Sequence, residues 1–155
     1  MAEQKPIDAE SSAVQTHLNI MQGVIQRMAE NSRACKMWCV TLVAAVLVLV
    51  ARTGEPQHAL LALVPTALFG VLDSYYLALE RAFIKSHNAF VAKLHRGKLE
   101  PTNVYRVAPT GMGLLLVGRC LGSVSIWLFY PLVVATVVLA WLLILPSVTP
   151  AEALQ

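Results

Sequence analysis

The sequence has few charged residues and none of the common catalytic motifs. Of its 155 residues, 14% are charged and 57% are hydrophobic, whereas soluble domains carry about 25% charged residues. The phosphate-binding Walker loop, the zinc-binding HExxH motif and the GxSxG nucleophile elbow are all absent from the sequence. These absences exclude the motif-bearing enzyme classes, and we expect a protein without enzymatic activity.

Cysteines are also scarce, and their number is odd: Cys35, Cys39 and Cys120. Cys35 and Cys39 share one face of a predicted helix, but two thiols without nearby His or Cys partners do not make a zinc site. The four histidines and nine acidic residues show no metal-ligand spacing either. We therefore expect buried, reduced thiols, no metal site and no cofactor.

Long apolar runs are what the sequence has in abundance, and two of them form a predicted transmembrane hairpin over residues 36–80. Residues 37–51 and 59–72 contain no charged residue and are separated by the polar turn RTGEPQ. Lys36 and Trp38 are expected at the membrane entry, the cation outside the hydrocarbon and the indole at the interface. We expect the second helix to start near His58 and to bend at Pro65. A third run, residues 123–145, is long enough for another span.

A helix is predicted ahead of the hairpin, capped by Ser11 or Ser12 and continuous with the first span. Its apolar residues are spaced 4, 3, 4 and 3 apart, which places them on one helical stripe: Val14, Leu18, Met21, Ile25 and Met28. Two interpretations of the stripe stay open. It packs on another helix of the same subunit, or it mediates self-association, because the same spacing is the coiled-coil seam.

The predicted fold is therefore an all-α integral membrane protein that forms a homo-oligomeric bundle. A long helix extends from span two and ends at Gly97, after basic residues in its last turn. The predicted parts are a cytoplasmic amphipathic helix (1–35), the hairpin (36–80), a basic cytoplasmic or interfacial segment (81–122), a third span (123–146) and a tail (147–155). Every Lys and Arg except Arg52 falls on the side of residues 1–36 and 80–122, and the positive-inside rule makes that side cytoplasmic.

The second span carries a stripe of small and polar residues: Thr66, Gly70, Asp73 and, beside it, Ser74. One interpretation is that this face packs on Ala44 and Ala45 of the first span, with Asp73 hydrated at the level of the headgroups. The other is that the stripe lines a water-filled path in an oligomer. On the second interpretation Thr66, Gly70, Asp73 and Ser74 are pore-lining residues.

The segment after the hairpin is basic, and two interpretations of its charge are open. The basic residues attract anionic lipid headgroups and set topology, or several subunits pool them into a site for a phosphate-rich ligand such as a nucleotide or an oligonucleotide. The candidate ligand-binding residues are Arg81, Lys85, His87, Lys93, His95, Arg96, Lys98 and Arg106.

The hairpin and its flanks resemble a known family. The runs VIQRMAENSRACKMWCVTLVAAVLVLVA, ALLALVPTALF and LDSYYLALERAF are similar to the SLATT-like, small bacterial two-helix membrane effectors found beside nucleotide-producing immune enzymes. The resemblance covers roughly residues 14–95. It implies an anti-phage effector of the bacterial inner membrane that oligomerises and depolarises or permeabilises that membrane when a nucleotide signal changes. One variant, the Hailong type, is a tetrameric channel held shut by an oligonucleotide.

We therefore expect an oligomeric ion-conducting pore, gated from the cytoplasmic side by a nucleotide or oligonucleotide. Its expected partners are membrane lipids, further copies of the chain and a nucleotide-producing enzyme. The alternatives are a non-conducting membrane scaffold that recruits a soluble partner and a subunit of a larger transporter.

Overall fold

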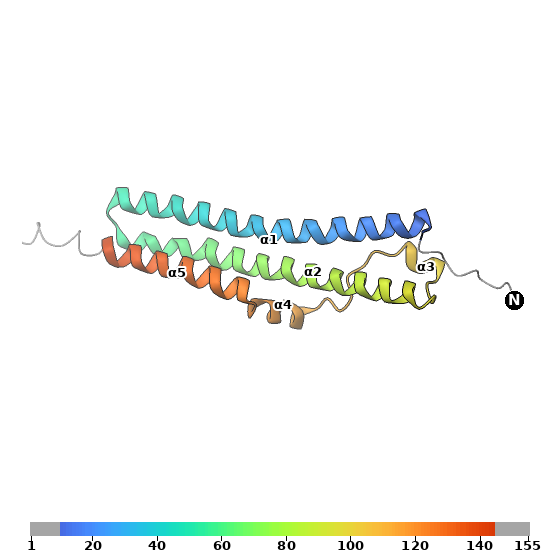
Figure 1. Ribbon diagram of the computed structural model, residues 1–155. Helices are drawn as coiled ribbons and strands as arrows, with labels where there is room; N and C mark the ends of the chain where they lie inside the picture. The colour runs from blue at the N-terminus through green and yellow to red at the C-terminus, as the bar shows by residue number, and fades with distance from the viewer. Residues whose placement is uncertain (1–9, 145–155) are drawn as a thin grey trace, which may run out of the picture.

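The computed structural model describes residues 10–144, and within that range the chain is helical and contains no strand (Figure 1). Its elements are α1 (Ser12–Thr53), the 3-10 helix η1 (Pro56–Ala62), α2 (Leu63–His95), α3 (Pro101–Val104), α4 (Leu114–Leu121) and α5 (Val124–Ile144). Three helical stretches are long and apolar enough to cross a membrane. This confirms the predicted all-α membrane architecture. The predicted tail, the end of the third run and residues 1–9 lie outside the described residues.

Helix α1 joins the predicted amphipathic helix and the first span without a break. Ser11 caps it, because its side chain accepts a hydrogen bond from the Val14 N–H, and the helix then runs for 42 residues, or about 63 Å. Gly54 ends it in the left-handed conformation at φ 70°. Val14 and Met21 of the apolar stripe are buried inside the chain. This burial fits the interpretation in which the stripe packs on another helix of the same subunit. Self-association through the stripe stays a prediction.

The start of the second span differs from the expectation. Residues Pro56–Ala62 form a 3-10 helix, and α2 begins only at Leu63. Pro65 therefore lies in the first turn of α2, where a missing N–H removes no helical hydrogen bond, and not inside the helix as expected. The other end agrees with the prediction: Gly97 has φ 63°, and its N–H bonds the carbonyl of Leu94.

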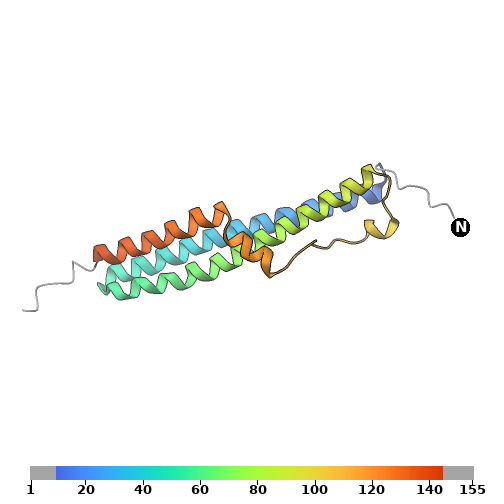
Figure 2. The same cartoon turned by 90° about the horizontal axis from the view of Figure 1, so that it is seen from below.

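Helices α1 and α2 lie side by side and antiparallel along the length of the molecule (Figures 1 and 2). Small residues of α2, each four positions after the last, are buried along one face of the helix: Thr66, Gly70, Ser74, Ala78, Ala82 and Ser86. The expected α1 partners, Ala44 and Ala45, are exposed. Cys39, Val43 and Val50 are the buried residues of α1 at this level, so the predicted face of α1 was wrong.

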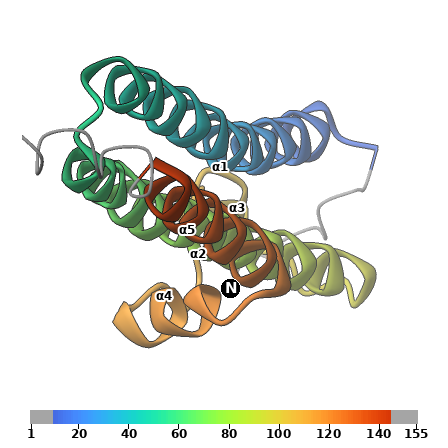
Figure 3. The same ribbon diagram turned by 90° about the vertical axis from the view of Figure 1, so that its left-hand side faces the viewer.

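Helix α5 packs against α1, α2 and η1, which makes one end of the molecule a three-helix bundle (Figures 1 and 3). We call residues 37–75 and 124–144 the apolar half. Beyond it α1 and α2 continue as a two-helix extension, residues 12–35 and 76–95. Residues 96–113, including α3, return along this extension and are called the strap (Figure 2). Each part has a core of its own, around Cys39 and Tyr130 in the apolar half and around Phe90 and Val104 in the extension.

The apolar half turns large hydrophobic side chains outward. Val64, Leu68 and Val71 on α2 and Leu128 and Leu132 on α5 are each more than half exposed. The polar residues Thr66, Asp73 and Ser74 of α2 in the same half are buried instead. This distribution fits a lipid surround, in which outward-facing groups are apolar and polar groups must find partners inside the protein.

Candidate functional site

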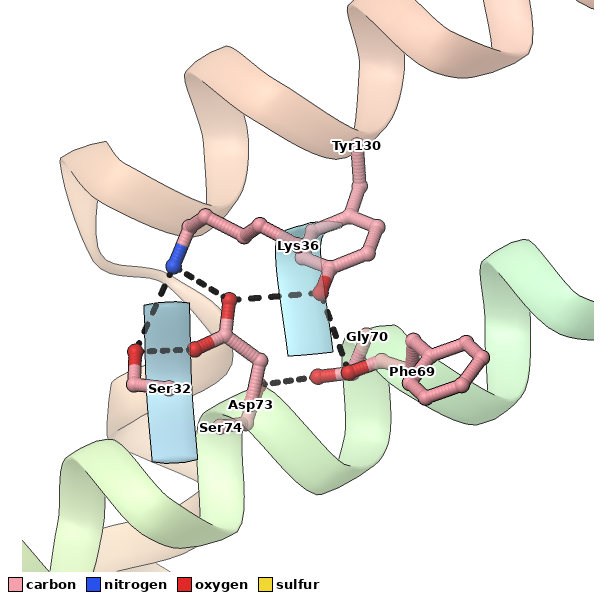
Figure 4. Close-up of polar contacts among 7 residues, drawn as sticks. All are labelled: Ser32, Lys36, Phe69, Gly70, Asp73, Ser74 and Tyr130. Carbon is pink, nitrogen blue, oxygen red and sulfur yellow. Dashed lines mark hydrogen bonds and ion pairs between the residues drawn. The ribbon is translucent and has the colours of Figure 1, made fainter. Parts of the chain in front are cut away.

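The most unusual feature of the structure is a carboxylate that is completely buried between three helices. Asp73 of α2 has an exposed fraction of 0%. Its Oδ2 lies 2.5 Å from the Lys36 ammonium of α1, and Ser32, one turn earlier on α1, donates a hydrogen bond to its Oδ1. Burying a charge is costly unless it is paired and hydrogen-bonded, and Asp73 has both kinds of partner (Figure 4).

The third helix completes this cluster through Tyr130 of α5. The Tyr130 hydroxyl lies 3.2 Å from Asp73 Oδ2 and 3.0 Å from the Phe69 carbonyl oxygen, so its one proton is shared between two acceptors (Figure 4). One further bond orders the charged side chains, because the Lys36 ammonium donates to the Ser32 hydroxyl at 3.4 Å. We call Ser32, Lys36, Asp73 and Tyr130 the polar junction, because it joins α1, α2 and α5 through side chains.

The local sequence explains why the junction forms. Ser32 and Lys36 are four residues apart, so they lie on the same face of α1. Gly70 lies under the tyrosine: a Cβ at this position would be 3.5 Å from the Tyr130 ring, an ordinary contact. A side chain larger than that of alanine at position 70 would hold α5 away, and the hydroxyl would no longer reach Asp73.

Exposed aromatic residues surround the junction, an arrangement typical of a membrane interface. Trp38 follows Lys36 by two positions, Tyr75 follows Asp73 by two, and Trp127 precedes Tyr130 by three, and all three are exposed. Amphipathic aromatic rings concentrate at the boundary between hydrocarbon and water. The junction is therefore buried at the level where the three apolar helices would enter the bilayer.

The predicted pore-lining residues all lie inside the chain. Asp73 and Ser74 have exposed fractions of 0%, and Thr66 of 4%; the Thr66 and Ser74 hydroxyls bond the carbonyls of Ala62 and Gly70 on their own helix. The polar face is thus packed, but Asp73 is not hydrated at the headgroups as that interpretation assumed. That the polar face of α2 lines a path in an oligomer stays a prediction. Such a path would require the helices packed on this face to move away from it.

Tyr130 and Lys36 both turn toward the buried carboxylate. A tyrosine in an apolar run usually lies in the interfacial aromatic belt, but Tyr130 is 7% exposed and turned inward. Lys36 was expected to extend toward water, whereas its ammonium pairs with Asp73 and its side chain is 21% exposed. Both differences have one cause: a fully buried carboxylate attracts the nearest donors of the neighbouring helices.

The eight predicted ligand-binding residues are spread along the extension and the strap. Lys93 and Arg106 line one cavity. Arg81 reaches Cys120 of α4, with 3.5 Å between its Nη1 and the sulfur, and His87 is partly buried. Lys85, His95, Arg96 and Lys98 are exposed on α2 or just beyond its end. A single chain therefore brings two of these eight residues into a common site.

That cavity, of about 290 Å³, lies between α1, α2 and the strap. His17 of α1 also lines it, a residue that the prediction did not include. His17 is 3% exposed, its ring stacks on Phe90 with 4.2 Å between centroids, and its Nδ1 has no hydrogen-bond partner among the described residues. A sequence signal existed, because position 17 adjoins the apolar stripe at Leu18.

The cysteines are free and buried, as predicted. No group of three or more His, Cys, Asp or Glu within residues 10–144 could hold a metal ion. Comparisons with protein families, with curated proteins and with solved structures give no match to this chain. The polar junction and the cavity lined by Lys93 and Arg106 are therefore the features of the described residues that bear on function.

Proposed function

We propose that the protein is a homo-oligomeric membrane effector that conducts ions, with the polar junction as its gate and the extension as its regulatory part. The observation that carries the proposal is the fully buried Asp73 at the level of the membrane interface. Ionisable residues inside membrane helices are expensive and typically mark ion or proton paths. The SLATT-like resemblance of residues 14–95 supports the same function, in anti-phage defence at the bacterial inner membrane.

The closed junction explains how a conducting protein can have a packed polar face. Tyr130 of α5 covers Asp73 and Gly70. When α5 moves away in an oligomer, the stripe Thr66, Gly70, Asp73 and Ser74 becomes the polar lining of the path. Asp73 then exchanges its hydrogen-bond donors in the protein for water. The Lys36–Asp73 pair is thus either buried or hydrated, and these are the two discrete states that gating needs.

The orientation follows from charge. Within residues 10–144, every Lys and Arg except Arg52 lies in or next to the extension, the strap and α4. By the positive-inside rule the extension faces the cytoplasm, where a nucleotide-class ligand made by a partner enzyme has access to it.

The test is ion flux through proteoliposomes that contain the full-length protein and a potassium gradient. Tyr130→Phe removes the hydroxyl that reaches Asp73 and keeps the ring on Gly70, so we expect it to raise the flux. Thr136→Val is the matched control, because it removes an α5 hydroxyl that bonds only the Leu132 carbonyl and lies on the exposed face. An absence of flux in the parent protein and in Tyr130→Phe would refute the pore.

One observation favours a second candidate, a non-conducting membrane scaffold. All four stripe residues are already packed within one chain, so no second copy is needed to bury them. The mass of the detergent-solubilised particle separates the two functions. A ring of four or more chains supports the pore, and a monomer supports the scaffold.

A further inference from the structure

The cavity in the extension has the composition of an anion site. Lys93 and Arg106 supply two cations from different segments, α2 and the strap. Asn103 and Thr110 line it as well and carry hydrogen-bonding groups. No acidic residue is among the described residues that line it. Charge-assisted hydrogen bonds from Lys and Arg to phosphate are among the strongest that proteins form.

His17 is the buried residue of this site. A buried polar atom without a partner costs about 1–3 kcal/mol, so Nδ1 of His17 is an unusual feature in a closely packed helix pair. Phe90 holds the imidazole in place from α2. A bound anion gives Lys93 and Arg106 an ionic partner, and the imidazole beside them a hydrogen-bond partner, that the described residues do not supply.

The size of the cavity restricts the ligand. Pockets for small molecules enclose about 300–1,000 Å³, and this one, at about 290 Å³, is at the small end. It admits a phosphate group with a compact body attached. An oligonucleotide strand would not fit inside it, and would have to bind along the outer surface of α2.

The position of the cavity identifies the source of the ligand. His17 precedes Lys36 by 19 residues on the unbroken helix α1, which corresponds to about 28 Å along its axis. The junction at Lys36 is at the level of the aromatic belt, so a headgroup in the same bilayer cannot reach the cavity. The ligand therefore comes from the aqueous phase.

We propose that the cavity between His17, Lys93 and Arg106 binds a compact soluble phosphate monoester of about mononucleotide size. The proposal rests on the proposed regulatory role of the extension and narrows its eight candidate residues to Lys93 and Arg106, with His17 added. Binding at this cavity does not depend on whether the protein conducts ions.

Binding at this place would hold the strap against the two helices. The strap is attached here by few bonds: the Ser86 hydroxyl donates to the Ala108 carbonyl at 2.7 Å and lies 2.6 Å from the Thr110 hydroxyl. Lys93 lies 3.3 Å from Asn103. A phosphate bound by both Lys93 and Arg106 adds an ionic link between α2 and the strap, which leads directly to α4 and α5.

The experiment measures binding of adenosine 5′-monophosphate, inorganic phosphate and adenosine to the full-length protein in phosphatidylcholine nanodiscs by calorimetry. We expect the two phosphates to bind and adenosine not to bind. Lys93→Gln and Arg106→Gln should each weaken binding about tenfold, the effect of losing one charge-assisted hydrogen bond. Both residues are exposed, so the variants should fold. His17→Phe keeps the ring on Phe90 and should also weaken binding.

Lys98→Gln is the matched control, because Lys98 is an exposed cation just beyond α2 that does not line the cavity. If it weakens binding as much as Lys93→Gln does, diffuse charge explains the binding and the site is refuted.

Equal binding of adenosine would refute a phosphate site. Loss of binding in phosphatidylglycerol nanodiscs would assign the site to lipid phosphate and overturn the soluble source. Binding without ion flux supports the site and refutes the pore, and flux without binding does the reverse.

Discussion

Replacing Lys36 with methionine tests whether the polar junction stabilises the three-helix bundle. Methionine keeps much of the apolar stem of lysine and removes the ammonium that lies 2.5 Å from Asp73. No other Lys or Arg within residues 10–144 forms a salt bridge with this carboxylate. In the variant Asp73 stays fully buried and keeps two hydroxyl neighbours, Ser32 and Tyr130.

The expected loss of stability is about 2–3 kcal/mol. Removing one partner of a buried ion pair costs about 3–5 kcal/mol, because an uncompensated charge is left behind. Two features of this site reduce that cost. The Ser32 and Tyr130 hydroxyls still stabilise the carboxylate, and the Lys36 side chain is 21% exposed, so its charge is already partly screened by solvent.

The measurement is the free energy of unfolding in mixed micelles titrated with dodecyl sulfate, followed by the fluorescence of Trp38 and Trp127. Arg33→Met is the control, since Arg33 is an exposed cation on the previous turn of α1, and it should change stability by less than about 0.5 kcal/mol. Adding Asp73→Leu to Lys36→Met should recover stability, because no charge then stays buried. Equal effects of Lys36→Met and Arg33→Met would show that the ion pair does not stabilise the bundle.

Three further predictions follow. Gly70→Leu forces a side chain into the Tyr130 ring and should cost about 1–3 kcal/mol, measured in the same micelles, whereas Gly70→Ala makes only an ordinary contact and should be tolerated; equal effects would contradict this packing. Ser86→Ala removes the two hydrogen bonds that the Ser86 hydroxyl makes to the strap, so trypsin should cleave at Arg106 faster than in the parent protein, and an unchanged rate would show that the remaining contacts, such as the bond from Thr110 N–H to the Ala82 carbonyl, hold the strap. A reporter enzyme fused at Gln155 should be active outside the cytoplasm, and cytoplasmic activity would contradict the three-span topology.

The sequence was sufficient to predict the three long helices, because their signals are local. Apolar run length gave the three spans, the 4, 3, 4, 3 spacing gave the amphipathic part of α1, and Ser11 and Gly97 gave helix ends through capping and left-handed backbone conformation. The start of α2 was less predictable. A proline at position 56 begins a 3-10 turn as readily as an α-helix, and η1 packs against α1 and α5, which the local sequence does not show.

The partners of the polar residues could not be predicted, because they depend on which helices meet. Asp73 was recognised as unusual from its place on α2, but its donors come from positions 41 residues earlier and 57 residues later. Tyr130 lies in an apolar run where a tyrosine normally suggests an interfacial position. Only the placement of α5 over Gly70 shows that its hydroxyl points inward.

The junction and the cavity are joined by continuous structure, which makes a regulatory connection between them physically reasonable. Helices α1 and α2 run unbroken from one to the other, so the extension cannot move without turning or shifting the helices that carry Ser32, Lys36 and Asp73. Tyr130 belongs to a different unit, because α5 is connected to the extension only through the strap and α4. A ligand that fixes the strap on α2 therefore biases the one junction residue that does not belong to α1 or α2. If a ligand favours the closed junction, closure of the junction must favour the ligand to the same extent, since coupling between two sites is reciprocal.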